Sequence, residues 1–410
     1  MLSLQLMRLK KSSSVVFWGI FLRILSRVHH RKLKFSLGEE MFMLFAVGGQ
    51  SGQRLLFPSG LRRICEKWRK VFQIVRITLI LQIGRISTKV TVWEQAHHTN
   101  FSSVTEFLLL GFSNLGETQL ILFAVFLCLY LVILTGNITI VTVIRLDRSL
   151  HIPMYFFLGV LSISETCYTF VILPKMLVNL LSLLRTISFV NCAIQMFFFL
   201  GFAVTNCMLL GVMGYDRYAA ICHPLRYPVL MRWQVCGQLA AACAAIGFLF
   251  SMTGSFLVFE LPYCGPNKIN HYFCDISPVI RLACTDTYVN ELIIFIGGVL
   301  ALMVPLTFIC ISYGFIVHTI VKIPSTEGKL KAFSTCASHL TVVIVHYGCA
   351  SFVYLRPSSK YSFSKDRLVT VTYTVVTPLL NPMVYSLRNK DVQLAIRKVI
   401  GRRGFFPKNL

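Results

Sequence analysis

The chain has 410 residues, of which 55% are hydrophobic, 13% aromatic and 14% charged, and its formal net charge at pH 7 is +24. So apolar a composition excludes a soluble domain of this length and indicates a protein that crosses a membrane several times. The positive charge suits either nucleic acid or anionic lipid, and its meaning depends on where along the chain it lies.

Residues 1–97 hold 17 of the 40 Lys and Arg residues and only four acidic residues. Their apolar stretches are short, interrupted by Arg and without a sustained period, which predicts neither a membrane span nor a packed domain. No cleavable signal peptide is evident, because Arg23 breaks the first apolar run and no clear small-residue cleavage site follows. We expect an atypical, disordered basic extension with no assigned function and no nucleic-acid partner.

The rest of the chain contains seven apolar stretches long enough to cross a bilayer core of about 30 Å, which requires roughly 20 helical residues. Lipid offers no partner for unpaired backbone groups, and the alternation of β-barrel strands is missing, so each stretch is predicted to be a helix. The predicted spans are residues 119–144, 154–178, 191–215, 234–258, 291–321, 331–355 and 368–387. The expected fold class is an all-α membrane protein, a seven-transmembrane helix bundle over residues 98–398 with a short basic tail at 399–410.

The basic residues between the spans predict the orientation of the bundle. If the first span starts outside, the inner loops and the tail hold 15 Lys and Arg residues and the outer loops hold 8. Because cytosolic loops carry the excess of Lys and Arg, the N-terminus is expected outside and the C-terminus in the cytosol.

Outer segments contain one candidate glycosylation site and four cysteines. Asn100 starts an Asn-Phe-Ser triplet just before the first span, where such a site is accessible on the outer side. Cys192, Cys264, Cys274 and Cys284 fall on the oxidising side of the membrane. Four cysteines allow three pairings, and the sequence alone does not choose between them.

Polar residues lie within or at the ends of five of the predicted spans. Such groups are costly in lipid, so they either mark a functional site or hydrogen-bond the helices to one another. These residues are Asn137, Glu165, Asp216, Arg217, Tyr313, Asn381 and Tyr385.

Several motifs resemble those of a known family. Gly136-Asn137 in the first span, Asp216-Arg217-Tyr218 ending the third and the NPMVY run at 381–385 in the seventh are similar to those of rhodopsin-like G-protein-coupled receptors. Longer motifs resemble olfactory receptors, from about Asn100 to Lys398: PMYFFL at 153–158, MGYDRYAAICHPLRY at 213–227, KAFSTCASH at 331–339 and PLLNPMVYSLRN at 378–389.

The resemblance implies an odorant receptor that activates a stimulatory heterotrimeric G protein, raises cAMP and lies in the plasma membrane, in the cilia of olfactory neurons. An adjacent acid and base at the inner boundary can exist locked together or released, which makes a two-state element. The residues expected to form this switch are Asp216, Arg217, Tyr218, Tyr313, Asn381, Pro382 and Tyr385, with Asn137 and Glu165 as an intramembrane polar network.

The same family places a ligand pocket in the outer half of the bundle, for which ordinary helix packing is the alternative interpretation of the residues concerned. Gly297, Gly298 and Ala301 would leave room from the fifth span. The residues expected to line it are Phe199, Leu200, Ala203, Val204, Tyr347, Ala350, Ser351 and Tyr354. So apolar a lining, with a few hydroxyls and no buried charge, suits a small, volatile, neutral ligand.

By the same resemblance, Cys192 pairs with Cys274, and Cys264 pairs with Cys284. The run His271 to Asp275 could instead ligate a soft metal through its His and Cys, but a disulfide at Cys274 competes with that fate, and we expect no metal.

Other function classes have less support in the sequence. A transporter or channel would show internal repeats, broken span pairs or a ring of charges, and none is visible. No enzymatic motif occurs, so neither catalysis nor a cofactor is expected. A rhodopsin-like receptor for a small molecule other than an odorant is the remaining alternative.

Overall fold

The computed structural model describes residues 104–112, 116, 118–182, 184–355, 369–388 and 390–402. The chain divides into two units, residues 1–99 and 100–410, and everything described belongs to the second. The expectations for the extension at 1–97, for glycosylation of Asn100 and for the tail beyond residue 402 therefore lie outside the described residues.

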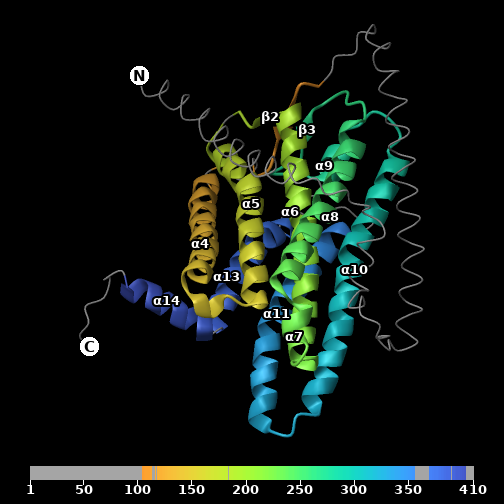
Figure 1. The fold of residues 1–410 in the computed structure, drawn as a ribbon. Coiled ribbons are helices and arrows are strands. Elements are labelled where there is room, and N and C mark those ends of the chain that lie inside the picture. The colour runs from red at the N-terminus through yellow and green to blue at the C-terminus, as the bar shows by residue number, and fades with distance from the viewer. Residues whose placement is uncertain are drawn as a thin grey trace. The chain divides into compact units, whose positions relative to one another are not determined.

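Six long helices confirm the first six predicted spans and lie side by side as a bundle (Figure 1). All six are long and apolar enough to cross a membrane. They are α4 (Thr118–Leu146), α5 (Pro153–Leu181), α6 (Phe189–Cys222), α8 (Trp233–Phe259), α10 (Tyr288–Val321) and α11 (Thr326–Tyr354). The largest extension beyond a predicted inner boundary is that of α6, because the polar residues after 215 end the apolar stretch without ending the helix.

The seventh span is a shorter apolar helix over Val369–Val384 and is not regular. It contains a π-helical turn, η4 (Thr372–Val376), which runs directly into α13 (Thr377–Arg388). Such turns are rare and are frequently found at functional sites. Hydropathy does not reveal this turn, and it becomes important for the position of Tyr373.

A further helix, α14 (Lys390–Arg402), follows the seventh span and crosses the boundary expected at residue 398. Tyr155 in α5 donates a hydrogen bond of 3.1 Å to the Asp391 carboxylate at the start of α14. Lys398 forms an ion pair of 3.3 Å with Asp147, but its side chain is 59% exposed, so the pair adds little stability. These contacts attach α14 to the ends of α4 and α5.

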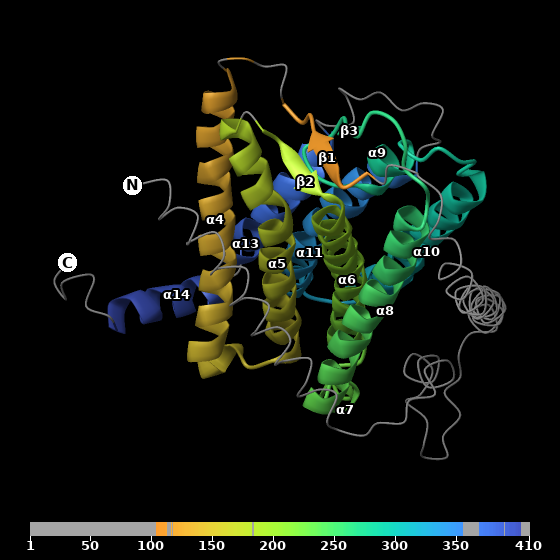
Figure 2. The ribbon, with the colours of Figure 1, turned by 90° about the horizontal axis from the view of Figure 1, so that it is seen from above.

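The opposite end of the bundle carries a small sheet that the sequence analysis did not predict. Strand β1 (Glu106–Leu109) pairs antiparallel with β2 (Thr186–Ser188) and parallel with β3 (Lys268–Ile269). We call this sheet and the loop residues 261–287, which include the short helix α9 (Ile276–Ile280), the lid. Figures 1 and 2 show it over one end of the bundle, while α7 (Tyr227–Leu230) lies at the other.

Strand β1 is held by burial as well as by backbone pairing. Phe107 and Leu109 are 0% and 1% exposed. The Phe107 ring packs against Phe189 and Tyr263, with centroids 5.8 and 5.6 Å apart. The segment just before the first span is therefore part of the folded bundle.

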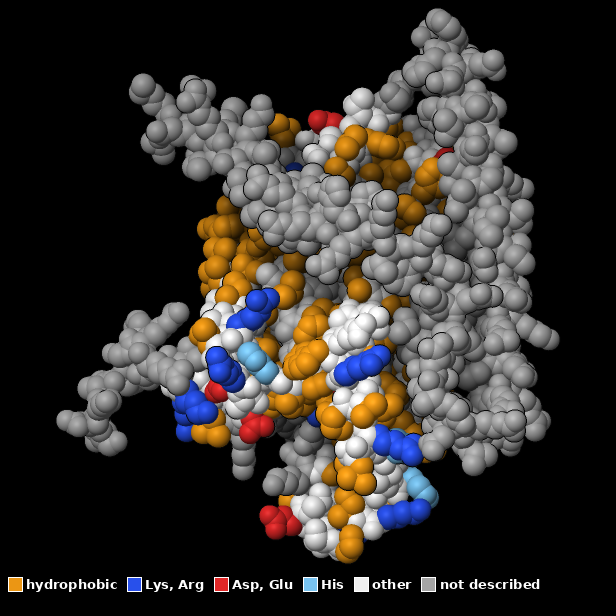
Figure 3. Space-filling view, viewed as in Figure 1, with side chains coloured by type: hydrophobic (Ala, Val, Ile, Leu, Met, Phe, Trp, Pro, Cys, Tyr) orange, Lys and Arg blue, Asp and Glu red, His pale blue; other side chains and the backbone are white. Residues whose placement is uncertain are grey.

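The flanks of the bundle are apolar, as a lipid-facing surface requires. Large hydrophobic side chains such as Leu120, Ile121 and Ile344 are exposed on α4 and α11. Figure 3 shows hydrophobic side chains over the flanks, with Lys and Arg gathered toward the end that carries α7 and α14.

Truncation tests two statements: that β1 belongs to the folded unit, and that the extension at 1–97 does not. Deleting residues 1–99 should leave delivery to the cell surface unchanged. Deleting residues 1–110 should strongly reduce surface delivery, since it removes Phe107 and Leu109, whose burial is worth roughly 1.5–3 kcal/mol each. Surface labelling of an epitope tag on both truncated proteins measures this. Equal surface levels of the two truncations would show that β1 is dispensable.

Candidate functional site

The lid is joined to the bundle by a disulfide between Cys192, at the start of α6, and Cys274, just before α9, with Cα atoms 5.5 Å apart. A second disulfide joins Cys264 to Cys284 within the lid, with Cα atoms 5.8 Å apart. These are the two pairs implied by the resemblance. Since Cys274 is in a disulfide, its thiolate is not a metal ligand here.

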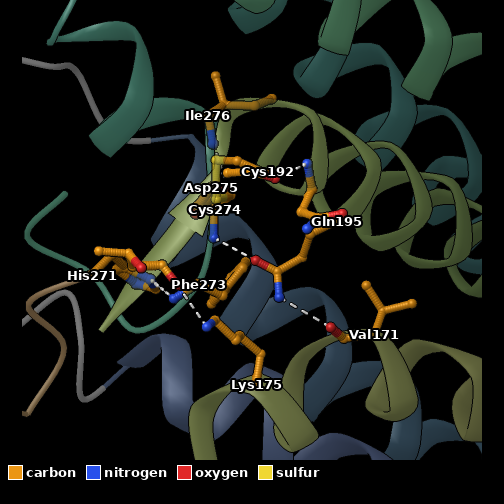
Figure 4. The surroundings of a disulfide bond; sticks show 12 residues. Val171, Lys175, Cys192, Gln195, His271, Phe273, Cys274, Asp275 and Ile276 are labelled. Carbon is orange, nitrogen blue, oxygen red and sulfur yellow. Dashed lines mark hydrogen bonds between the residues drawn. A yellow bond between two sulfur atoms is a disulfide. The ribbon is translucent and has the colours of Figure 1, made fainter. Parts of the chain in front are cut away.

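Gln195 supports the first disulfide and was missed by the sequence analysis. Its side-chain oxygen accepts a 3.0 Å hydrogen bond from the Cys274 backbone, and its amide donates one of 3.0 Å to the Val171 carbonyl (Figure 4). One side chain thus connects the lid, α6 and α5. A glutamine in an apolar helix was the available signal.

The eight expected pocket residues lie on the inward faces of α6 and α11. Phe199, Leu200, Ala203, Val204, Tyr347 and Ala350 are buried, and Ser351 and Tyr354 are half-buried. Phe199 contacts Phe273 of the lid, with ring centroids 4.8 Å apart. The Tyr347 hydroxyl donates a 2.7 Å hydrogen bond to the Cys207 carbonyl, which links α11 to α6.

Two findings differ from the expected pocket. A Cβ added to Gly297 would lie 2.9 Å from the Phe250 ring, so this glycine lets α10 approach α8 and does not leave room for a ligand. A small open depression lies elsewhere, between α4, α5 and the lid, with Gln119, Asn179 and Tyr272 in its lining. None of the eight expected pocket residues lines it.

An aromatic cluster, consisting of Tyr168, His346, Tyr354 and Tyr373, lies next to the expected pocket. The Tyr373 ring, in the π-helical turn, has its centroid 6.1 Å from Tyr168, 5.5 Å from His346 and 6.0 Å from Tyr354. Tyr168 in turn contacts Phe199 at 5.5 Å. The sequence analysis named only Tyr354 of this cluster, because the direction of the other three side chains depends on the helix packing and on the π turn.

The intramembrane polar network joins the first, second and seventh spans. The Asn381 amide donates a 2.9 Å hydrogen bond to the buried Glu165 carboxyl. The Asn137 amide donates to the carbonyls of Ile133 and Pro378, at 3.0 and 3.4 Å. A Cβ on Gly136 would lie 2.9 Å from Pro382, so the glycine permits the approach that makes these bonds possible.

At the inner end of α6, Asp216 and Arg217, for which both a locked and a released arrangement were expected, are not paired with each other. Asp216 is buried and accepts a 2.9 Å hydrogen bond from the Tyr227 hydroxyl. No ion pair joins Asp216 to Arg217 in the part of the chain that the structure describes. Successive residues on a helix point in different directions and do not face each other. Burial and the Asp216 carboxylate raise the pKa of Tyr227, so this hydroxyl stays protonated as a donor.

His339, in α11, joins three helices close to Arg217. Its Nδ1 lies 2.9 Å from the Tyr313 hydroxyl of α10, and its Nε2 lies 3.1 Å from the Leu210 carbonyl of α6. The Arg217 charge acts on both His339 and Cys336 of α11. His339 falls in the KAFSTCASH motif but was not named as a switch residue, since a lone His at a helix end gives no such signal.

The remaining switch residues are placed as follows. The Tyr218 hydroxyl lies 3.0 Å from the His223 Nε2 atom, at the end of α6. Pro382 lies within α13, and the side chain of Tyr385 lies outside the described residues. Arg217, Tyr313 and the Asp216–Tyr227 pair therefore gather at the end opposite the lid, while Asn381 and Glu165 lie deeper in the bundle.

Comparison with known proteins identifies the relatives of this chain. A family model described as olfactory receptor matches residues 126–403. The chain is 76% identical over 305 residues to human olfactory receptor 10R2, covering 74% of this chain and 91% of that protein. It is 62% identical over 298 residues to human olfactory receptor 10T2, covering 73% of this chain and 95% of that protein. It is 53% identical over 303 residues to mouse olfactory receptor 10J5, covering 74% of this chain and 98% of that protein.

Asp275, the first residue before α9, makes the stability of the lid depend on pH. Desolvation by burial raises its pKa to about 6, against a smaller opposite effect of its hydrogen bond from the Ile276 backbone. The folded form therefore binds a proton more tightly than the unfolded form. The stability that this proton provides is complete below about pH 4 and is lost as the pH rises through about 6.

We predict that the melting temperature of the purified protein rises as the pH falls from about 7.5 to about 5, and that Asp275→Asn weakens this rise. The raised pKa of Asp275 corresponds to about 2–3 kcal/mol in the free energy of unfolding. Melting of both proteins at each pH isolates the contribution of Asp275, because the other titrating groups are shared. An identical pH dependence in the two would contradict the assignment.

Proposed function

Because the chain belongs to the olfactory receptor family, we propose that it binds small, volatile, neutral odorants in the outer half of the bundle and activates a stimulatory G protein, raising cAMP. The family consists of receptors that span the membrane several times and are not enzymes. The finer statements, on the pocket, the G protein and the second messenger, are our proposal. So is its location in the ciliary plasma membrane of olfactory neurons.

The observation that carries the coupling proposal is the bridge made by His339. Its two ring nitrogens contact α10 and α6 while the residue itself belongs to α11. The ring also stacks on Tyr313, with an interplanar angle of 6°. Separating the inner ends of these helices therefore requires the loss of both contacts. The two contacts define a closed state, and a ligand can shift the equilibrium between this state and an open one.

Arg217 is the proposed contact with the G protein. It lies half-buried at the inner end of α6. The neighbouring Asp216 carboxylate accepts a hydrogen bond from Tyr227 and is not paired with Arg217. Opening of the bundle exposes its guanidinium, which presents several donors to the backbone carbonyls or carboxylates of a partner. Tyr218, Tyr313 and, on the seventh helix, Asn381, Pro382 and Tyr385 rearrange with it in this proposal.

Ligand binding is proposed between α6 and α11, beneath the lid. Phe199, Leu200, Ala203 and Val204 supply one wall and Tyr347, Ala350, Ser351 and Tyr354 the other. The contact between Phe199 and Phe273 of the lid makes the upper edge of this site sensitive to lid position. A neutral ligand fits a wall that carries hydroxyls and aromatic rings but no Lys or Arg.

Arg217→Ala tests the coupling role. This variant should lose odorant-driven cAMP by at least about tenfold while reaching the cell surface normally, since the residue acts on the partner and not in the core. The assay is a cAMP reporter in cells that express the olfactory stimulatory G protein, with a broad odorant panel.

Arg148→Ala is the matched control, because Arg148 is exposed at the same end of the bundle and has no assigned contact with the partner. It should signal normally. Full signalling by Arg217→Ala at equal surface level would refute the coupling role. A wild-type chain that reaches the surface but answers no odorant would contradict odorant reception itself.

A further inference from the structure

His346, in α11, is a buried histidine with one ring nitrogen that lacks a partner. The residue is 2% exposed, and its Nε2 lies 3.2 Å from the Cys207 thiol of α6. Among the described residues, no group hydrogen-bonds to its Nδ1, which is itself buried. Buried polar atoms are almost always paired, so this nitrogen needs an explanation.

The unused capacity of Nδ1 does not depend on the tautomer. A neutral imidazole has one N–H donor and one acceptor nitrogen. If Nε2 donates to the Cys207 sulfur, Nδ1 is left as an acceptor; if the thiol donates to Nε2, Nδ1 carries the proton and is left as a donor. In either case one strong hydrogen-bonding group lies unused inside the bundle.

The position of His346 connects it to the proposed ligand site. On α11, His346 lies one helical turn on the inner side of Ala350, and on α6, Cys207 lies one turn on the inner side of Ala203. The His346 ring touches Tyr373, which touches Tyr354, with centroids 5.5 and 6.0 Å apart. The imidazole therefore lies at the inner end, or floor, of the proposed pocket.

The charges around this floor restrict which ligand it can accept. No Lys or Arg side chain is buried among the residues that the structure describes, so a carboxylate on the ligand would find no cation to pair with there. The walls nearest His346 are the rings of Tyr347 and Tyr373. A neutral oxygen with an apolar tail fits both conditions.

We propose that His346 Nδ1 is the specificity-determining hydrogen-bonding group of the odorant site, and that it selects neutral alcohols, aldehydes or ketones over hydrocarbons of the same shape. The ligand oxygen pairs with Nδ1, and the carbon chain extends toward Phe199 and the lid. This inference rests on the proposed odorant function and deepens it. A site with a buried polar group rejects an analogue that leaves the group unpaired, which is a stronger filter than shape alone.

The test compares ligands that differ only in the oxygen. Each alcohol, aldehyde or ketone that activates the wild-type receptor is paired with the hydrocarbon of the same carbon skeleton, and with the primary amine as a third probe. Responses are measured as half-maximal concentrations in the cAMP assay at equal surface level. The wild type should prefer the oxygenated ligand by about tenfold or more.

His346→Phe keeps a ring of similar size and removes both nitrogens, so it should lose this preference, with little change for the hydrocarbon. His346→Asn places an amide near the Nδ1 position and should retain part of the preference. His318→Phe makes the same change at an exposed histidine of α10 and should have no effect. If His346→Phe does not reach the surface, His346→Met fills the same space with a flexible apolar chain and takes its place.

The proposal would be overturned if His346→Phe weakened the response to the oxygenated ligand and to its hydrocarbon equally. It would also be overturned if His346→Phe kept the wild-type preference for the oxygenated ligand. A preference for the amine that disappears in Glu165→Gln would also overturn it, because the carboxyl would then be the selecting group. Each of these outcomes leaves odorant reception intact. A receptor that answers no odorant fails the proposed function instead, so the two failures are distinguishable.

Discussion

A polar group inside a membrane bundle is costly unless another group pairs with it, and the pairs that form between helices organise the structure. The Asn381–Glu165 hydrogen bond holds the seventh span against the second, and Asn137 holds it against the first. Nearer the inner end, His339 satisfies its two nitrogens on two other helices. Because each pair links different helices, a change in helix position has to break particular hydrogen bonds, which gives the bundle discrete states.

Helix α6 connects the regions that the proposed function requires. It begins at the disulfide to the lid, continues through Phe199 and Cys207 beside the aromatic cluster, and ends at Asp216 and Arg217. Most of its length is buried by neighbouring helices. A ligand that alters the packing between α6 and α11 therefore acts on the same two helices that His339 joins at the inner end.

The sequence was sufficient for the features that depend on long apolar stretches. The first six spans follow from hydropathy, and the shorter seventh was still recognisable. Strand β1 could not be predicted, because four residues have no secondary-structure signal of their own and are fixed by pairing with β2 and β3. Tyr373 was missed for a similar reason, since the π turn changes the direction of its side chain. The partner of Asp216 could not be read from the sequence either, because Tyr227 lies eleven positions away and reaches it only through the fold.

The central claim is that the contacts of His339 keep the inner ends of α6 and α11 together until a ligand shifts the bundle. Distance measurements between labels at Leu225 and Leu330, both highly exposed at that end, test it most directly. The account predicts that an activating odorant with the G protein lengthens this distance, and that His339→Ala lengthens it without any odorant. An unchanged distance in both conditions would contradict it.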